Sequence, residues 1–151
     1  MLIKTHLIIT LFFVLLLLPF VSHKIVFILL ALLATYVPDI DTKNSKLGKK
    51  KIFRPLQIFM KHRGFFHSFT FLFLITLIFV IFVPIFALGF FLGYSSHLLA
   101  DGFTLEGIMP FYPWKRKIFG RIRTGSQKES IILVTFLILD VLLVLRYILA
   151  S

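Results

Sequence analysis

Two apolar runs joined by one proline dominate the middle of the sequence. Residues 65–101 read FFHSFTFLFLITLIFVIFVPIFALGFFLGYSSHLLAD. The first run extends from Phe65 to Val83 and the second from Ile85 to Leu99, with Pro84 between them. A helix needs about 20 apolar residues to cross the roughly 30 Å hydrocarbon core of a bilayer. The first run therefore predicts a membrane-crossing helix, and the second predicts a shorter helix that follows a hinge at Pro84.

Three further apolar runs flank this pair, over Leu7–Phe20, Ile25–Val37 and Ile131–Leu149. The last is long enough to cross a bilayer. The first two and the run Ile85–Leu99 are short, so they either cross a thinned bilayer or form hairpins that do not fully span it. The chain has 151 residues, of which 59% are hydrophobic, and its mean hydropathy is +1.00. A soluble domain of this size has too much surface to bury that much apolar side chain. We predict a single integral membrane domain over residues 1–151, an all-α polytopic bundle of about five hydrophobic helices.

Basic residues are concentrated in two loops, and the formal net charge is +11. One loop follows the second run and the other follows the fourth; they carry Lys43, Lys46, Lys49, Lys50, Lys51, Arg54, Lys61 and Arg63, and Lys115, Arg116, Lys117, Arg121, Arg123 and Lys128. The positive-inside rule predicts a multi-pass cell-membrane protein whose N-terminus and basic loops are cytoplasmic and whose C-terminus is outside. Expected partners are the bilayer and its anionic phospholipid headgroups, not nucleic acid, and a protein partner stays open.

Polar side chains occur at the ends of the apolar runs, where a membrane helix does not need them. They begin the first and third runs and end the second and fourth, and they are His6, Asp39, Asp41, His62, Arg63, His67, Ser68, His97 and Asp101. Because four successive helices alternate in direction, all of these ends meet on the cytoplasmic side. The pattern therefore predicts one functional site there.

The residue types at these ends suit a metal ion. Imidazole and carboxylate bind zinc and also accept manganese or iron, and the absence of cysteine excludes a thiolate site. His97 and Asp101 are four residues apart, so they share one helix face, and Tyr94 lies on that face one turn earlier. Asp39 and Asp41 project together if the backbone there is extended. The predicted ligands of one or two divalent ions, zinc before manganese or iron, are His6, Asp39, Asp41, His62, His67, His97 and Asp101.

Some polar residues have simpler explanations. His23 lies on the opposite side and is expected to be an interfacial anchor. Asp140 lies midway along the fifth run with no partner in register, which predicts a buried, protonated or helix-paired carboxyl and leaves a role in conduction open. The Lys and Arg runs are expected to be solvated, lipid-facing loops first and substrate clamps second.

Several motifs occur in an order and spacing that resembles a known family. They are His6, Pro38–Asp41, His62–Ser68, Gly93–Asp101 and Gly107–Pro110. In these motifs, over almost the whole chain, the sequence resembles the membrane-bound metal-dependent hydrolases that include the LexA-binding inner-membrane protein. That family is in turn similar to the zinc-dependent phospholipases C and related single-strand nucleases, which hydrolyse phosphodiesters.

The resemblance implies a phospholipase C/nuclease-like helical core and a ligand set. In those enzymes an Asp, a His and a helical His-x-x-x-Asp pair hold zinc ions that activate water. The matching residues here are Asp39 or Asp41, His67, His97 and Asp101. The phospholipases also use their N-terminal amine and a Trp carbonyl, for which the sequence gives no sign. They carry further late ligands, for which only Glu129 and, less well placed, Glu106 are available, so one or two ions are expected rather than three.

A hydrolase of a phosphoester, such as a phospholipid at the cytoplasmic interface, is the leading hypothesis. Asp39 or Asp41 would act as ligand or general base, and Arg63 would hold the phosphate. Further candidate substrate contacts are Ser68, Tyr94, Arg121, Arg123 and Glu129. One alternative is a non-enzymatic membrane protein with a structural metal site that recruits a partner or anionic lipid. The other is a small transporter that uses Asp140.

Overall fold

The computed structural model describes residues 1–41 and 64–150, and within these ranges the regular structure is helical with two isolated β-bridges. Its elements are α1 (Ile3–Leu17), η1 (Leu18–Phe20), α2 (Lys24–Ala34), η2 (Pro38–Asp41), η4 (Phe65–His67), α4 (Phe69–Phe82), α5 (Pro84–Gly102) and α6 (Gln127–Ala150), where η marks a 3-10 turn. This agrees with the predicted all-α class. It also places a helix in each of the five apolar runs.

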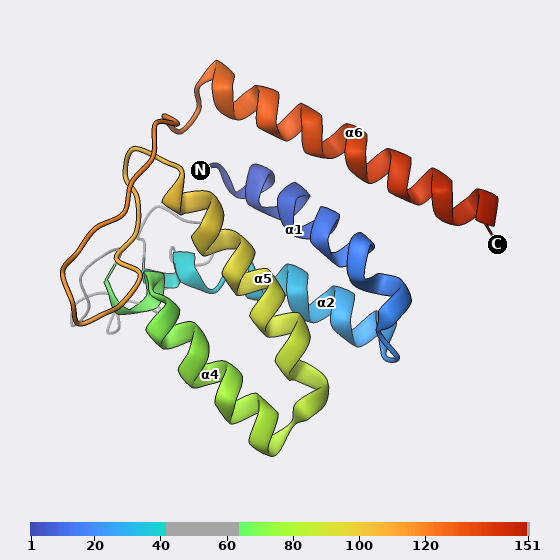
Figure 1. The fold of residues 1–151 in the computed structure, drawn as a ribbon, viewed down its shortest axis with the longest axis horizontal. Coiled ribbons are helices and arrows are strands. Elements are labelled where there is room, and N and C mark those ends of the chain that lie inside the picture. Colours follow the sequence, from blue (N-terminus) through green and yellow to red (C-terminus); the bar gives the residue numbers. More distant parts are fainter. Residues whose placement is uncertain (42–63, 151) are drawn as a thin grey trace.

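Helix α5 lies in the middle of the arrangement and packs against α1, α2 and α4 (Figure 1). Its face toward α2 contains Gly89 and Gly93, and a methyl group on Gly93 would lie 1.9 Å from the carbonyl oxygen of Ala31. Small residues let helix backbones approach closely, which favours helix association in lipid. On the side toward α4, Tyr94 and Leu98 are fully buried in the main apolar cluster. The packing of α5 therefore depends on glycine on one side and on large side chains on the other.

The first and last helices of the described chain lie side by side and run in the same direction (Figure 1). Thr5 near the start of α1 contacts Glu129 near the start of α6, and the Tyr147 hydroxyl donates to the Leu15 carbonyl near their other ends. The N-terminus consequently lies beside the end of α5 and the start of α6.

The boundaries of two helices differ from those expected. The hydroxyl of Ser68 accepts a hydrogen bond from the Phe71 amide and caps α4, which leaves Phe65–His67 as a separate turn. Helix α4 has only 14 residues, so the prediction of a membrane-crossing helix over Phe65–Val83 is wrong in length. Two other segments, Ile3–Phe20 and Gln127–Leu149, are long and apolar enough to cross a membrane. The predicted hinge is confirmed, because α4 ends at Phe82 and α5 begins at Pro84.

Large apolar side chains are exposed along α4 and α6. They include Phe73, Leu77 and Phe82 on α4 and Ile131 and Leu149 on α6. Contiguous apolar surface on this scale is unfavourable in water and suits a lipid surrounding.

The close contact of α2 and α5 gives a stability prediction. Gly93→Ala forces a methyl group onto the Ala31 backbone, so the helices must separate, and we expect a loss of about 1–3 kcal/mol in the free energy of unfolding. The measurement is thermal or denaturant unfolding in detergent. Gly102→Ala is the matched control, because its added methyl would meet its nearest neighbour, Ile108, at 4.0 Å. Equal stability of the two variants would contradict the proposed packing.

Candidate metal centre

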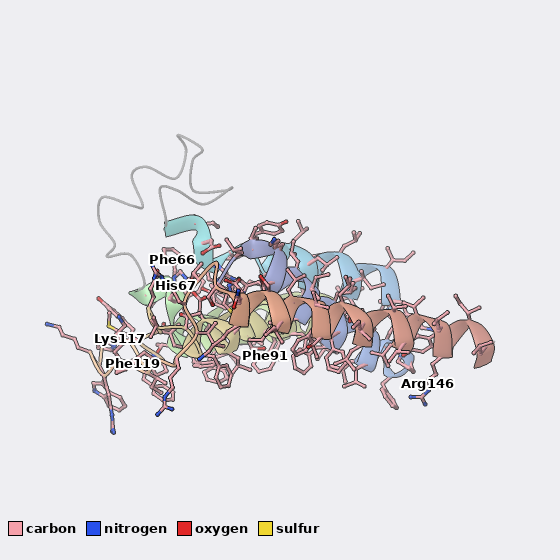
Figure 2. All side chains as sticks on the ribbon, turned by 90° about the horizontal axis from the view of Figure 1, so that it is seen from above. Phe66, His67, Phe91, Lys117, Phe119 and Arg146 are labelled. Atoms are coloured by element: carbon pink, nitrogen blue, oxygen red, sulfur yellow. The ribbon has the colours of Figure 1, made fainter. Side chains whose placement is uncertain are left out.

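Side chains from four separate elements meet at one end of the molecule. His6 comes from α1, Asp39 from η2, His67 from η4, and His97 and Asp101 from the last turns of α5. Figure 2 shows His67 at this end, with Arg146 of α6 at the opposite one. The ends of the apolar runs that the sequence singled out are thus close in space within the described residues.

Two of these side chains, Asp39 and Asp101, each approach both His67 and His97. The Asp39 Oδ1 atom lies 3.9 Å from His67 Nε2 and 3.8 Å from His97 Nε2. The Asp101 Oδ2 atom lies 3.9 Å from His67 Nε2 and 3.8 Å from His97 Nε2. Ligands at about 2.0–2.1 Å from a tetrahedral zinc ion are about 3.3–3.4 Å apart. The four separations exceed this spacing by about half an ångström. Asp39, His67 and His97 offer ligand atoms that all lie within 4.8 Å of one another.

The orientation of His97 is set by a backbone carbonyl. Its Nδ1 atom lies 2.8 Å from the carbonyl oxygen of Thr35, which can only accept, so Nδ1 carries the proton. The Nε2 lone pair then faces Asp39 and Asp101, and the atom has no hydrogen-bond partner among the described residues although it is fully buried. A buried acceptor without a donor is costly. Metal-ligating histidines usually have their other nitrogen held in this way, so the arrangement fits a metal ion.

The second oxygen of Asp101 faces α1. The amino group of Met1 donates to Oδ1 at 2.6 Å, and His6 Nε2 lies 3.3 Å from the same oxygen. The His6 ring stacks on His97 with centroids 3.9 Å apart, and His6, His97 and Asp101 form a second group of convergent ligand atoms. This position of the amine was not predicted from the sequence. Asp101 therefore presents one oxygen to each group, which suits one ion or two.

Asp39 forms the open side of the centre. Its side chain is 27% exposed, whereas those of His67, His97 and Asp101 are at most 2% exposed. Burial is still sufficient to raise the pKa of Asp39 above its ordinary value, although His67 and His6 nearby act in the opposite direction. A bound cation would favour the ionised carboxylate and so oppose the effect of burial.

A hydroxyl network behind the ligands was missed by sequence reasoning. Thr10 of α1 bonds Thr35 at 2.9 Å and Ser96 of α5 at 2.6 Å, and all three residues are buried. The network joins α1, the end of α2 and α5 one turn from His6 and beside His97. The only signal in the sequence is spacing, because Thr10 follows His6 by four residues and Ser96 precedes His97 directly.

Three candidate substrate contacts form hydrogen bonds to other parts of the protein. Ser68 caps α4 and also donates to the Phe65 carbonyl, and the Tyr94 hydroxyl donates to the Phe66 carbonyl. Glu129 accepts hydrogen bonds from Leu2, Thr5 and Gly125 and ties the start of α6 to α1. In these contacts the three side chains connect elements of the fold, and a role toward substrate stays a prediction.

The remaining predicted residues are placed as follows. Arg121 and Arg123 are exposed in the segment between α5 and α6. His62 and Arg63 lie outside the described residues. Asp41 ends η2, so the predicted extended backbone at Asp39 and Asp41 is wrong: Pro38 begins a 3-10 turn, with the Asp39 amide bonded to the Tyr36 carbonyl.

Two further residues considered in the sequence analysis, His23 and Asp140, lie away from this end. His23 is exposed at the opposite end of the bundle, before α2. Asp140 is 4% exposed on α6, and neither of its carboxyl oxygens has a hydrogen-bond partner in the part of the chain that is described.

Comparison with known proteins gives a family. A family profile described as the YdjM inner membrane protein matches residues 1–150. The chain belongs to this family. It is 34% identical over 123 residues to the inner membrane protein YdjM of Escherichia coli (strain K12), a match that covers 74% of this chain and 63% of that protein. The YdjM of Shigella flexneri matches with the same values.

A Bacillus relative matches more weakly. The uncharacterised protein YvsG of Bacillus subtilis (strain 168) is 29% identical over 103 residues, which are 64% of either chain. The chain thus spans less than two thirds of the length of these relatives. No solved structure matches. Membership of the YdjM family, together with the two long apolar helices, shows that this chain is a membrane protein. The names of its relatives do not state a chemical activity.

The ligand arrangement predicts metal binding that depends on α5. Detergent-purified protein should contain a stoichiometric divalent metal by elemental analysis, and a His97→Ala/Asp101→Ala variant should lose it. His23→Ala removes an imidazole from the opposite end and should retain the metal. Metal at equal content in the double variant, or none in the wild type after purification without chelators, would contradict the site.

Asp39 predicts a pH dependence of the metal-free protein. Because burial raises the pKa of Asp39, the folded chain binds a proton there more readily than the unfolded chain. This contribution to stability is complete below the ordinary carboxyl pKa and is lost as pH rises through the raised value. Asp39→Asn should remove this fall in stability with rising pH. Above the raised pKa of Asp39, the chelator-treated variant should therefore be more stable than the chelator-treated wild type.

The measurement is the unfolding midpoint of chelator-treated protein from about pH 4 to about pH 7, a range that begins at the ordinary carboxyl pKa. An Asp39→Asn profile parallel to that of the wild type would show that burial of Asp39 does not govern the titration.

Proposed function

We propose that this member of the YdjM family is a membrane-embedded, metal-dependent hydrolase that acts on a phosphoester, such as a phospholipid, at the cytoplasmic interface. The observation that carries the proposal is the approach of both Asp39 and Asp101 to His67 and His97, with Asp39 on the open side. The resemblance to zinc-dependent phospholipases C and nucleases supports it, because the same residue types occur there in the same order.

The proposal includes a multi-pass arrangement with the N-terminus and the basic loops in the cytoplasm. Figure 2 shows Lys117, the last of three consecutive cations, at the same end of the molecule as His67. Positive loops are retained in the cytoplasm. In this arrangement the centre lies near the depth of the lipid headgroups. A phosphoester of a lipid would then reach it without leaving the membrane surface.

The donor set would favour zinc, with manganese or iron as alternatives, because it combines two imidazole nitrogens with carboxylate oxygens. When bound, the metal would supply a lowered pKa for coordinated water and a polarised phosphoryl oxygen. His67, His97 and Asp101 would hold it from the buried side. Asp39, which is partly exposed, would complete the coordination or accept a proton from water, and Asp41 would take the other of these two roles.

Basic residues would bind the phosphate of the substrate. Arg63 follows from the sequence pattern, and its guanidinium offers the paired donors that match phosphate oxygens. Arg121 and Arg123 are exposed on the segment between α5 and α6 and are further candidates.

A specific observation favours a second function, a non-enzymatic membrane protein with a structural metal that recruits a partner or anionic lipid. Structural zinc sites are typically closed by four protein ligands. Four convergent side chains are present here, and those of three of them, His67, His97 and Asp101, are at most 2% exposed. This alternative predicts metal that stabilises the fold without turnover.

The two functions differ in one assay. Purified protein in mixed micelles should hydrolyse a chromogenic phosphodiester, or a phospholipid with a labelled headgroup, only with divalent metal. His97→Ala should abolish turnover, whereas Asp140→Asn should retain it because Asp140 lies on α6, away from the centre. Turnover of His97→Ala equal to the wild type would refute the hydrolase. Metal binding and stabilisation with no hydrolysis of any phosphoester would favour the structural alternative.

A further inference from the structure

The segment between α5 and α6 contains a closed loop that the proposed chemistry does not use. Ile108 and Ile118 exchange two backbone hydrogen bonds of 2.9 Å, which close the loop, and Phe119 follows directly. We call residues 108–119 the interfacial loop. Its sequence is IMPFYPWKRKIF, which combines aromatic residues with three consecutive cations.

Close backbone packing and hydrogen bonds fix the base of the interfacial loop. Gly107 adopts φ +57°, and a methyl group on it would lie 2.1 Å from the Ile118 carbonyl oxygen. The Phe69 amide donates to the Pro110 carbonyl at 2.8 Å, and the Thr70 hydroxyl donates to the Tyr112 carbonyl at 2.9 Å. The loop is therefore held against the first turn of α4.

Its outer side is both apolar and positively charged. Trp114 is 74% exposed and Phe119 is 67% exposed, and Figure 2 shows Lys117 and Phe119 projecting away from the helices. Lys115, Arg116 and Lys117 are exposed between these two aromatic side chains. Residues 107–126 contain five Lys and Arg and no Asp or Glu. Large exposed rings are unfavourable in water unless a partner covers them.

The position of the loop indicates which partner covers it. It is bonded to α4 where that helix begins, and the exposed apolar side of α4 starts one turn later at Phe73 and Leu74. An apolar hollow of about 170 Å³ lies between the base of the loop, α4 and α5. In a bilayer whose hydrocarbon covers the exposed side of α4, the loop would lie where hydrocarbon gives way to headgroups. Tryptophan is enriched at this level of membrane proteins, and basic residues there attract anionic lipid.

We propose that the interfacial loop is a binding site for anionic phospholipids at the bilayer surface. Its aromatic side chains insert among the headgroups, and Lys115–Lys117 bind their phosphates. The charge of the loop selects the lipid, since a zwitterionic surface offers no net negative charge to three adjacent cations. An acidic soluble protein is the competing partner, but it would not explain the continuity of the loop with the lipid-facing side of α4.

The chain contains a single tryptophan, so fluorescence from Trp114 reports on the loop alone. The full chain is reconstituted in nanodiscs of phosphatidylcholine mixed with phosphatidylglycerol. One of the two lipids is brominated near the headgroup end of its chains, and the quenching of Trp114 is measured. We expect quenching by brominated phosphatidylglycerol to exceed quenching by brominated phosphatidylcholine. Added acrylamide, a quencher in water, should have little effect.

A triple variant tests the role of charge. Lys115→Gln/Arg116→Gln/Lys117→Gln should reduce the preference for brominated phosphatidylglycerol several-fold, because each cation near an anionic surface adds to its affinity. The matched control is Lys4→Gln/Lys24→Gln/Arg146→Gln, which removes three exposed cations elsewhere and should retain the preference.

Three outcomes would overturn the proposal. They are efficient acrylamide quenching of Trp114 in both lipid mixtures, equal quenching by the two brominated lipids in the wild type, and protection of Trp114 only after a soluble protein is added. The readout needs neither metal nor turnover, so its result is independent of the proposed hydrolysis.

Discussion

The carboxylate of Asp101 is the group on which this end of the molecule depends. It is 1% exposed, and a buried carboxylate is costly unless it is paired. Its partners come from three elements: the amino group of Met1 and His6 from the start of the chain, His67 from η4, and His97 from its own helix. Each partner reduces the free-energy cost of burying the charged carboxylate, and the same contact fixes the position of that partner. The convergence of the chain at this end is a consequence of satisfying one buried anion.

The rest of the bundle permits this convergence. Gly93 lets α5 approach the backbone of α2, which brings Thr35 within reach of His97. The hydroxyl network of Thr10, Thr35 and Ser96 satisfies polar groups that would otherwise be buried among apolar side chains. Helix packing and the orientation of His97, a candidate metal ligand, therefore rest on the same few small residues. A substitution in this layer would affect stability and ligand geometry together.

Sequence patterns predicted the elements of this site better than its details. His97 and Asp101 were recognisable because a spacing of four fixes two side chains on one helix face, and the grouping at helix ends followed from alternating helix direction. The carbonyl of Thr35 and the amine of Met1 were not, because backbone groups carry no residue-type signal. The 3-10 turn at Asp39 was missed, because Pro38 fixes its own φ angle and does not determine the conformation of the residues that follow it. The capping role of Ser68 was also missed: its hydroxyl accepts a hydrogen bond from the Phe71 amide, so α4 begins at Phe69.

The pairing of α1 with α6 has a consequence for biogenesis. Glu129 accepts hydrogen bonds from Leu2 and Thr5, residues 127 and 124 positions earlier in the chain. During synthesis the first helix is made long before the last, so the start of α1 has no access to this partner until α6 has been translated and inserted. His6 lies in the first turn of α1, and Met1, whose amine donates to Asp101, lies just before this helix. The contacts of Met1 and His6 with Asp101 are therefore a late product of assembly, because a nascent chain that already contains α2, α4 and α5 still lacks the contact that fixes the start of α1.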